Sequence, residues 1–177
     1  MHSGSWGKIR KKEDCCMSEN RKLPNRSLIV SIAIPLLVGG VASFFTRAGV
    51  DEFEAIAQPP FAPPEWLFPV VWAILYVLMG VAAHRIWLRR DSDKTAAKAL
   101  RLYALQLFFN FIWSFLFFNQ KNYIGAFVWL VFLWALILLT IDAFYKIDKR
   151  AAYLMIPYAL WVTFAGYLNL GIALLNK

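Results

Sequence analysis

Five long stretches without a charged residue constrain this chain more than any other feature of its sequence. No Asp, Glu, Lys or Arg occurs in five segments of its 177 residues: 27–46, 66–84, 102–120, 122–141 and 151–176. An α-helix needs about 20 apolar residues to cross roughly 30 Å of hydrocarbon. The chain is also 60% hydrophobic and 17% charged, which is too apolar for an ordinary soluble domain. We therefore predict an all-α membrane protein, a bundle of five transmembrane helices.

The boundary between the third and fourth stretches is a single charge, Lys121. One continuous helix over both stretches would overshoot a bilayer. Asn119 and Asn122 flank the lysine, and Asn is a favoured turn residue. The sequence therefore predicts a tight polar turn here and two separate helices.

The basic residues predict the orientation of the chain. Seven of the 19 precede residue 27, six lie in 85–101 and three lie in 146–150, all on one side of a five-span topology. The other side has only Arg47, Lys121 and Lys177. By the positive-inside rule we expect a multi-pass protein, in a bacterial cell membrane, with a cytoplasmic N-terminus and an external C-terminus. Topology explains the net charge of +8, so no nucleic-acid partner is expected.

The first 26 residues differ in composition from the rest. They are polar and basic, and we expect a disordered cytoplasmic tail before a single domain at 27–177. Met17 is an alternative start, since residues 11–14 can be encoded by purine-rich codons resembling a bacterial ribosome-binding site. The adjacent Cys15 and Cys16 have no further ligands nearby, so no metal site is expected.

A proline-rich loop connects the first two predicted spans. Residues 47–65 are the only long external segment, and they contain Pro59, Pro60, Pro63 and Pro64. Proline fixes its own backbone and favours extended geometry in the residue before it. We therefore expect a stiff, non-helical loop that lies over the outer mouth of the bundle as a lid and holds Phe61 there.

Polar and aromatic residues recur at helical spacing inside three of the spans. Gln106, Asn110 and Ser114 share one face, which must turn away from lipid, either to join helices or to line a cavity. The same spacing aligns two further sets: Trp72, Tyr76 and Gly80, and Tyr158, Trp161, Ala165 and Asn169. Together the three faces favour a pocket, with Gln106 and Asn110 as candidates for its polar lining.

Three segments resemble one known family. They are PPFAPPEWLFPVVWAILYVLMGVAAHRIW, QLFFNFIWSFLFFNQKN and YLMIPYALWVTFAGYLNLGIALLN. In this order and spacing they are similar to the TspO/MBR family of tryptophan-rich sensory proteins, relatives of the mitochondrial translocator protein or peripheral-type benzodiazepine receptor. The resemblance runs from about Ser27 to the C-terminus.

This resemblance implies a five-helix bundle, usually a homodimer, with a pocket capped by the first external loop. It also implies porphyrin ligands such as protoporphyrin IX, sterols in some members, and no cofactor beyond the porphyrin as ligand. Seven pocket positions carry over: Pro63, Trp72, Tyr76, Asn110, Trp113, Trp161 and Ala165. Phe53, where many members have Tyr, is a further candidate. Glu65 stands where Gly is common, and both departures disfavour a dicarboxylate ligand.

The resemblance favours a membrane receptor or carrier for tetrapyrroles, acting in stress sensing or tetrapyrrole homeostasis. An enzyme that degrades porphyrin with light and oxygen is an alternative, with Trp72 and Trp161 supplying or quenching radicals. Ordinary catalytic residues are not expected in the pocket, since His84 and Asp142 fall at the cytoplasmic ends of their spans. A further alternative is a sterol-binding or partner-organising protein; Leu139, Tyr145 and Lys149 fit a loose sterol pattern.

Overall fold

The computed structural model of the chain describes residues 23–53 and 56–176. The predicted tail therefore lies almost wholly outside the described residues, as do Cys15, Cys16 and the alternative start at Met17. The side chain of Phe53 is likewise outside them.

The structure has five long helices, which confirms the predicted number of spans. They are α2 (Leu23–Phe53), α3 (Leu67–Trp87), α4 (Ala96–Ser114), α5 (Tyr123–Ile147) and α6 (Lys149–Leu175). Helix α4 continues directly into a π-helical turn, η1 (Phe115–Asn119). All five are long and apolar enough to cross a membrane, counting α4 with η1 as one span.

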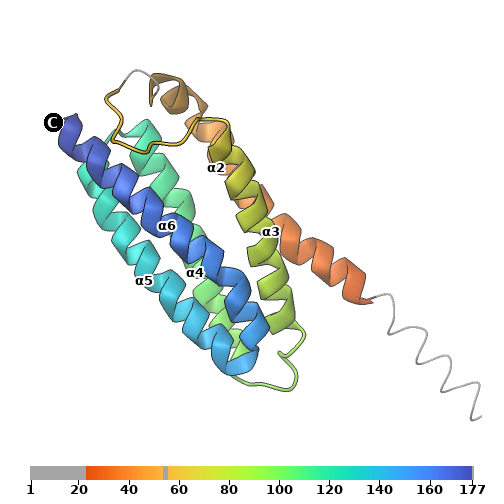
Figure 1. Ribbon diagram of the computed structural model, residues 1–177. Helices are drawn as coiled ribbons and strands as arrows, with labels where there is room; N and C mark the ends of the chain where they lie inside the picture. The colour runs from red at the N-terminus through yellow and green to blue at the C-terminus, as the bar shows by residue number, and fades with distance from the viewer. Residues whose placement is uncertain (1–22, 54–55, 177) are drawn as a thin grey trace, which may run out of the picture.

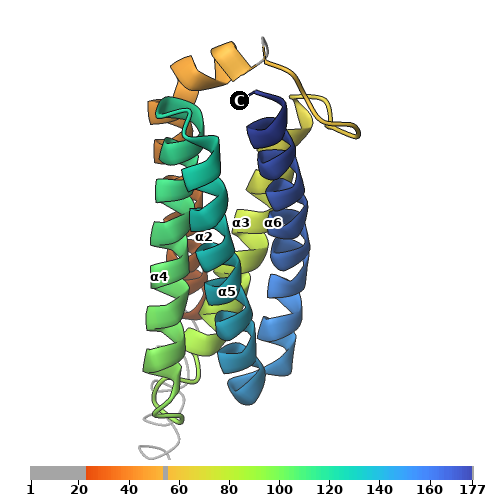
Figure 2. The same cartoon turned by 90° about the vertical axis from the view of Figure 1, so that its left-hand side faces the viewer.

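The helices close into a ring of neighbours. Helix α2 packs on α3, α3 on α6, α6 on α5, α5 on α4, and α4 with η1 returns to α2. Figure 1 and Figure 2 show the helices running side by side along one axis, with the chain reversing direction at each connection. We call the two ends of this bundle the loop end, where residues 56–66 lie, and the Asp148 end, where α5 meets α6.

The break between α4 and α5 lies at the polar turn that the sequence predicts. Lys121 has a φ of 50°, a left-handed conformation that ends the preceding helix. Asn122 then caps α5, because its side-chain oxygen accepts a hydrogen bond of 2.9 Å from the backbone N–H of Gly125. The two helices are thereby held as an antiparallel pair at the loop end.

Helix α2 differs from the other helices in its position and in its exposed apolar surface. It begins at Leu23, four residues before the predicted boundary, and Pro24 in its first turn removes no helical hydrogen bond. In Figure 2 its C-terminal end crosses the top of the bundle. Large apolar side chains point outward along it: Ile29, Val30, Ile34, Leu37, Val41, Phe44 and Phe45. Such a surface is stable only in contact with lipid or another apolar partner.

Contact between α2 and α3 depends on Gly80. A Cβ built there would lie 2.5 Å from the Cα of Ile32 and 2.7 Å from the carbonyl oxygen of Ser31. Real side chains do not approach a backbone so closely, so only glycine permits this packing. Gly80 continues the helical spacing of Trp72 and Tyr76, and in the structure it is where two helix backbones meet.

The connection from α2 to α3 is docked on the last turns of α6. The Ala57 N–H donates to Asn176 Oδ1 (3.1 Å), and Asn176 Nδ2 donates back to the Ala57 carbonyl (3.0 Å). The hydroxyl of Tyr167 donates to the Pro60 carbonyl (2.9 Å). Pro59 is buried against Gly171, where a Cβ would approach the proline ring to 2.7 Å. Residues 56–66 are non-helical and are fixed to α6 along one side. The prediction that the non-helical loop begins at residue 47 is wrong, because α2 continues to Phe53.

Candidate ligand-binding cavity

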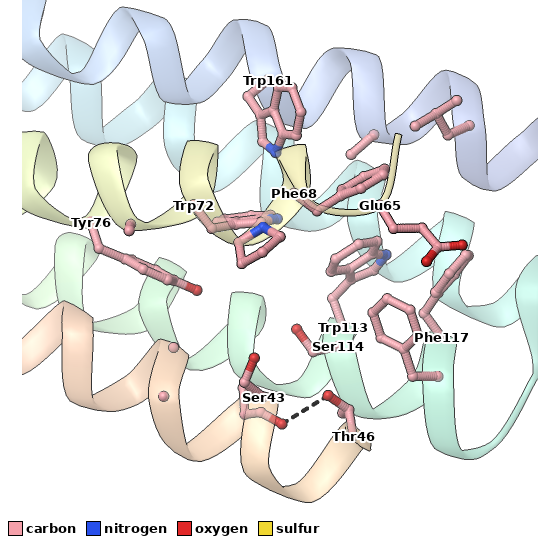
Figure 3. A pocket seen from close by; sticks show the side chains of 18 of the residues that line it. Ser43, Thr46, Glu65, Phe68, Trp72, Tyr76, Trp113, Ser114, Phe117 and Trp161 are labelled. Carbon is pink, nitrogen blue, oxygen red and sulfur yellow. Dashed lines mark hydrogen bonds between the residues drawn. The ribbon is translucent and has the colours of Figure 1, made fainter. Parts of the chain in front are cut away.

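A cavity of about 500 Å³ lies in the loop half of the bundle. Helices α2, α3, α4 and α6, the π-helical turn η1 and one loop residue enclose it, and α5 takes no part (Figure 3). Its walls are Leu36, Gly39, Gly40, Ala42, Ser43 and Thr46 from α2; Glu65 from the loop; Phe68, Pro69, Trp72, Ala73 and Tyr76 from α3; Trp113, Ser114, Phe117 and Phe118 from α4 and η1; and Trp161, Ala165, Leu168, Asn169 and Ile172 from α6. The volume falls within the roughly 300–1,000 Å³ of small-molecule sites.

Trp72 occupies the centre of the aromatic wall. Its ring centroid lies 5.5 Å from Tyr76, 6.5 Å from Trp113 and 6.1 Å from Tyr158. These separations lie in the range of favourable offset or edge-to-face ring pairs. The i, i+4 spacing of Trp72 and Tyr76 puts both on the cavity face of α3, so the predicted aromatic stripe is present there.

Helix α2 closes the cavity through two glycines that differ in their surroundings. A Cβ on Gly39 would lie 2.1 Å from Cε2 of Tyr76, so the tyrosine ring rests directly on the glycine. A Cβ on Gly40 would meet nothing within 4 Å. Gly39 therefore permits a contact, whereas Gly40 leaves open space in the cavity wall.

The π-helical turn η1 determines which residues of the third span face the cavity. Its winding is visible in the hydrogen bond from the Gln120 N–H to the Phe115 carbonyl (3.2 Å), five residues back. Phe117 and its sequence neighbour Phe118 both line the cavity, and their rings meet edge to face at 4.9 Å. Trp113 stacks on Phe117 with centroids 5.4 Å apart. The wider turn thus adds a second aromatic residue to this wall.

Helix α6 supplies one aromatic residue and mostly small or aliphatic ones. Trp161 packs edge to face on Phe68 at 5.8 Å, and Ala165, one turn further, leaves room beside it. Asn169 is fully buried on the same wall.

Three cavity-lining side chains have polar atoms without a hydrogen-bond partner among the described residues. These atoms are the indole N–H groups of Trp113 and Trp161 and both amide atoms of Asn169. A buried polar group without a partner costs about 1–3 kcal/mol. A ligand carrying hydrogen-bonding groups would satisfy these atoms.

The structure separates the predicted site residues into two groups. Trp72, Tyr76, Trp113, Trp161 and Ala165 line the cavity together. The others do not line it. Pro63 lines a second, shallower hollow of about 610 Å³ beside the mouth, and Glu65 and Phe68 belong to both spaces. Gln106 and Asn110 are buried outside the cavity walls.

Asn110 joins helices behind the cavity. Its Oδ1 accepts a hydrogen bond from the Tyr76 hydroxyl (3.4 Å), and its Nδ2 donates to the Tyr158 hydroxyl (2.8 Å). The bonds tie α4 to α3 and α6, so the first of the two alternatives for this polar face holds for Asn110. Gln106 is also fully buried, but neither amide atom has a partner among the described residues.

Phe61, which the sequence analysis placed in a lid over the bundle mouth, points away from the cavity in the structure. Its φ is 65° and its side chain is 87% exposed, and it lines neither the cavity nor the outer hollow. The hydrogen bond between Tyr167 and the neighbouring Pro60 carbonyl holds this turn against α6 instead. Glu65, Phe68 and Pro69 are the residues that border the mouth.

Several cavity residues were absent from the sequence prediction. Ser43 and Thr46 sit on α2, whose sequence shows no polar or aromatic stripe, and the Thr46 hydroxyl is occupied by the Ala42 carbonyl (2.9 Å). Phe68 lies one turn before Trp72, so extending the α3 stripe by four residues would have found it. Phe118 depends on the π-helical winding, for which the spacing gives no signal.

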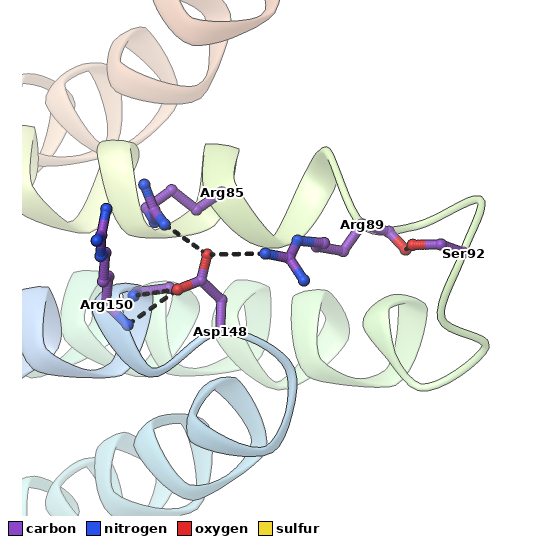
Figure 4. Close-up of polar contacts among 6 residues, drawn as sticks. Arg85, Arg89, Ser92, Asp148 and Arg150 are labelled. Atoms are coloured by element: carbon purple, nitrogen blue, oxygen red, sulfur yellow. Dashed lines mark hydrogen bonds and ion pairs between the residues drawn. The ribbon is translucent and has the colours of Figure 1, made fainter.

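The Asp148 end carries an ion-pair cluster (Figure 4). The Asp148 side chain is buried, accepts a hydrogen bond of 2.7 Å from Arg85, and lies 3.9 Å from Arg89. It also caps α6 by accepting from the backbone N–H groups of Arg150 (2.9 Å) and Ala151 (3.4 Å). Burial alone would raise the pKa of Asp148, but the hydrogen bonds from Arg85 and the two backbone groups outweigh it and lower the pKa below its usual range.

The cavity offers binding surface more than reactive groups. The described residues include no group of three or more His, Cys, Asp or Glu side chains able to hold a metal. His84 is buried near the Asp148 end, and Asp142 is exposed and paired with Lys146 at 2.5 Å, so neither reaches the cavity. The arrangement suits an apolar, ring-containing molecule held by stacking and a few hydrogen bonds.

Fold and site together define a multi-pass α-helical membrane protein with an aromatic cavity between its helices. The chain belongs to the TspO/MBR family, whose sequence profile matches residues 31–175.

Among curated proteins, a tryptophan-rich protein TspO of Chlorobaculum tepidum is 36% identical over 85% of this chain and 96% of its own length. A protein of the same name from Archaeoglobus fulgidus is 37% identical over 84% and 96% of the two lengths. The translocator protein of Bos taurus is 34% identical over 77% and 82%.

Proposed function

We propose that the protein is a membrane receptor or carrier that binds porphyrin-like tetrapyrroles and related planar hydrophobic molecules in the cavity. The resemblance to the TspO/MBR family carries the ligand class, and stress sensing or tetrapyrrole homeostasis is the setting it implies. The observation that supports it best is the convergence of Trp72, Trp113 and Trp161, from three different helices, on one cavity.

Physical chemistry favours such a ligand. Stacking on indole and phenol rings removes large flat apolar areas from water, at about 25 cal/mol per Å² before the cost of association. Macrocycles also carry ring nitrogens and polar substituents, which suit the unpartnered donors of Trp113, Trp161 and Asn169. Gln106 and Asn110 support the cavity from behind in this proposal, and the outer hollow at Pro63 lies on the entry route.

The charge distribution supports an orientation. We propose that the Asp148 end faces the cytoplasm of a bacterial cell and that residues 56–66 and the C-terminus face outside. Arg85, Arg89 and Arg150 gather at the Asp148 end, in agreement with the positive-inside rule. The family also implies a homodimer, for which the exposed apolar side of α2 offers a surface. Cysteine labelling from each side of the membrane and mass measurement in detergent test these two points.

Binding is tested by quenching of tryptophan fluorescence with protoporphyrin IX in detergent. We expect saturable quenching, weakened about tenfold, or ~1.4 kcal/mol, by Trp72→Ala because the central ring of the wall is lost. Trp161→Ala should weaken it as well. Trp87→Ala is the matched control, since Trp87 is half exposed at the opposite end of α3 and lies over Arg90. Equal affinities in all four proteins, or no saturation, would contradict the proposal.

A second candidate function is photo-oxidative degradation of the bound porphyrin. It is favoured by one observation: Trp72 and Trp161, the two residues predicted to exchange electrons with an excited ligand, both line the cavity. Illumination of the complex in air should then give new absorbance bands that depend on the protein. Trp161→Phe should preserve binding and slow their appearance, whereas an unchanged rate would count against this function.

A further inference from the structure

The residues that line the cavity differ in exposure from one helix to the next. In the part of the chain that the structure describes, five lining residues of α2 and α3 are exposed: Leu36, Gly40, Ser43, Pro69 and Ala73. Every lining residue of α4, η1 and α6 is buried or partly buried, although it borders the same space. The cavity is therefore open on the side where α2 and α3 meet. We call the opening between these five residues the lateral gap.

The contact between α2 and α3 loosens toward the lateral gap. At Gly80 the two backbones touch, and no Cβ could fit between them. At Gly39, nearer the loop end, the ring of Tyr76 reaches from α3 to α2 and separates the two backbones (Figure 3). At Gly40, a Cβ would meet no atom within 4 Å. The missing side chain of Gly40 thus leaves the gap open at a point where any other residue would begin to close it.

The lateral gap lies at the level of the hydrocarbon layer. The segment of α2 that can cross a membrane ends at Arg47, and Gly40 lies about 10 Å along the helix before that end. Ala73 lies about 9 Å along α3 from its first residue, Leu67. No charged residue occurs in 27–46 or 66–84, so none borders the gap. Lipid rather than water is therefore the medium outside it.

The cavity behind the gap favours a ligand over a lipid tail. Asn169 is fully buried on the far wall, and neither of its amide atoms has a hydrogen-bond partner among the described residues. An acyl chain has no group that could pair with an amide, whereas a molecule with a carbonyl, an ester or a ring nitrogen does. The occupant that fits is apolar enough to dissolve in the bilayer and carries a few polar atoms.

We propose that uncharged planar molecules dissolved in the bilayer enter and leave the cavity through the lateral gap between α2 and α3. The outer hollow at Pro63 serves ligands that arrive from water. Gly40 and Ala73, which face the gap from its two sides, set its width. This inference rests on the proposed function, since it concerns the route and the source of the same class of ligand.

The test measures exchange between cavity and bilayer within one membrane. Proteoliposomes are equilibrated with the uncharged dimethyl ester of protoporphyrin IX, and the relaxation of tryptophan fluorescence after a temperature jump is followed at several ester contents. The dependence on ester content gives the association rate constant, and the intercept gives the dissociation rate constant. We expect Gly40→Phe and Ala73→Phe each to lower both constants about tenfold, because a ring placed in the gap obstructs entry and exit alike.

Leu37→Phe is the matched control, because it adds a ring to the outward side of α2, where Leu37 is exposed and does not line the cavity. It should leave both rate constants unchanged. A ring that merely fills the cavity would weaken binding and speed dissociation, so faster or unaltered dissociation in both gap variants would overturn the proposal. Slowing by Ala62→Phe, in the outer hollow, without slowing by Gly40→Phe would place the route at the mouth instead.

The outcomes separate this inference from the function on which it rests. If protoporphyrin IX binds in detergent but its ester does not reach the cavity in vesicles, the lateral route is wrong and the binding function stands. If neither porphyrin binds under either condition, both proposals fail.

Discussion

The two halves of the bundle differ in how closely their helices pack. In the loop half, the helices spread around a cavity of about 500 Å³. Toward the Asp148 end, α2 and α3 touch backbone to backbone at Gly80, and Asp148 joins three segments through ion pairs and a helix cap.

This difference shows where the stability of the molecule is concentrated. Close helix contact and the ion pairs of Asp148 hold the Asp148 end together, whereas the loop half gives up packing to remain open. Substitutions at the Asp148 end should therefore lower stability, and substitutions around the cavity should change binding first. The following predictions test that division, from the largest expected effect to the smallest.

Asp148→Ala should cause the greatest loss of stability, about 3 kcal/mol, because it removes a helix cap and leaves Arg85 without its buried partner. Thermal unfolding in detergent measures the loss. Asp142→Asn, which removes an exposed carboxylate, should change stability by less than about 0.5 kcal/mol. Similar losses in both variants would remove the distinction between the two ends.

The same carboxylate predicts a dependence on pH. The pKa of Asp148 is lower in the folded protein than in an unfolded chain, where a carboxyl titrates near about 4. Its contribution is therefore complete above that pH and is lost as the pH falls through the lower folded-state pKa. The melting-temperature difference between the wild type and Asp148→Ala should shrink as the pH is lowered below about 4. A difference that stays constant would mean that the charge is not what stabilises this end.

Gly80→Ala should destabilise the protein by about 2 kcal/mol, because the added methyl group would enter the backbone of α2 at Ile32. Gly40→Ala is the control, since the same methyl group would enter open space and alanine is the better helix former. We expect that variant to be as stable as the wild type or slightly more stable. Loss of stability at Gly40 instead would show that the loop half is as tightly packed as the other.

Gly39→Ala should act on binding more than on stability. The methyl group would overlap the Tyr76 ring, which has to swing into the cavity to make room. We expect porphyrin binding to weaken about tenfold with a stability cost of about 1 kcal/mol. Gly40→Ala is again the matched comparison, and titration of both variants by fluorescence quenching measures the effect. Unchanged affinity in Gly39→Ala would exclude Tyr76 as a boundary of the binding site.

Gln106→Leu should have the smallest effect, and it should be stabilising, by about 1 kcal/mol. The side chain is fully buried and its amide atoms have no partner among the described residues, so an apolar side chain of similar size removes a desolvation cost. Because Gln106 lies outside the cavity walls, ligand affinity should not change. A clear fall in affinity would restore Gln106 to the predicted site.

Features that depend on short sequence distances were predictable. The number of spans follows from charge-free length, and the cavity faces of α3 and α6 follow from residues at i, i+4 spacing, Trp72 and Tyr76 on α3 and Trp161, Ala165 and Asn169 on α6. Two features depend on contacts between helices. The role of Asn110 was undecided because its partners, Tyr76 and Tyr158, are 34 and 48 residues away.

The contribution of α2 to the cavity comes from close approach rather than from chemical pattern, and it cannot be read from its own sequence. Gly39 matters because of the ring that rests on it. Phe118 lines the cavity because the π-helical turn is wound more widely than an α-helix. Predictions from i, i+4 spacing assume regular α-helical winding and therefore miss it. The outward position of Phe61 follows from its left-handed backbone and from the anchoring of Pro60, neither of which its aromatic character reveals.

The pair of hydrogen bonds between Ala57 and Asn176 has a consequence for biogenesis. The two residues are 119 positions apart and Asn176 follows α6, so the ribosome has made all five spans before this partner of the mouth segment exists. Helix α6 also supplies Trp161 and Asn169 to the cavity. A partly synthesised chain in the translocon thus has neither a finished mouth nor a complete cavity wall, and the cavity is closed only when the last helix is inserted.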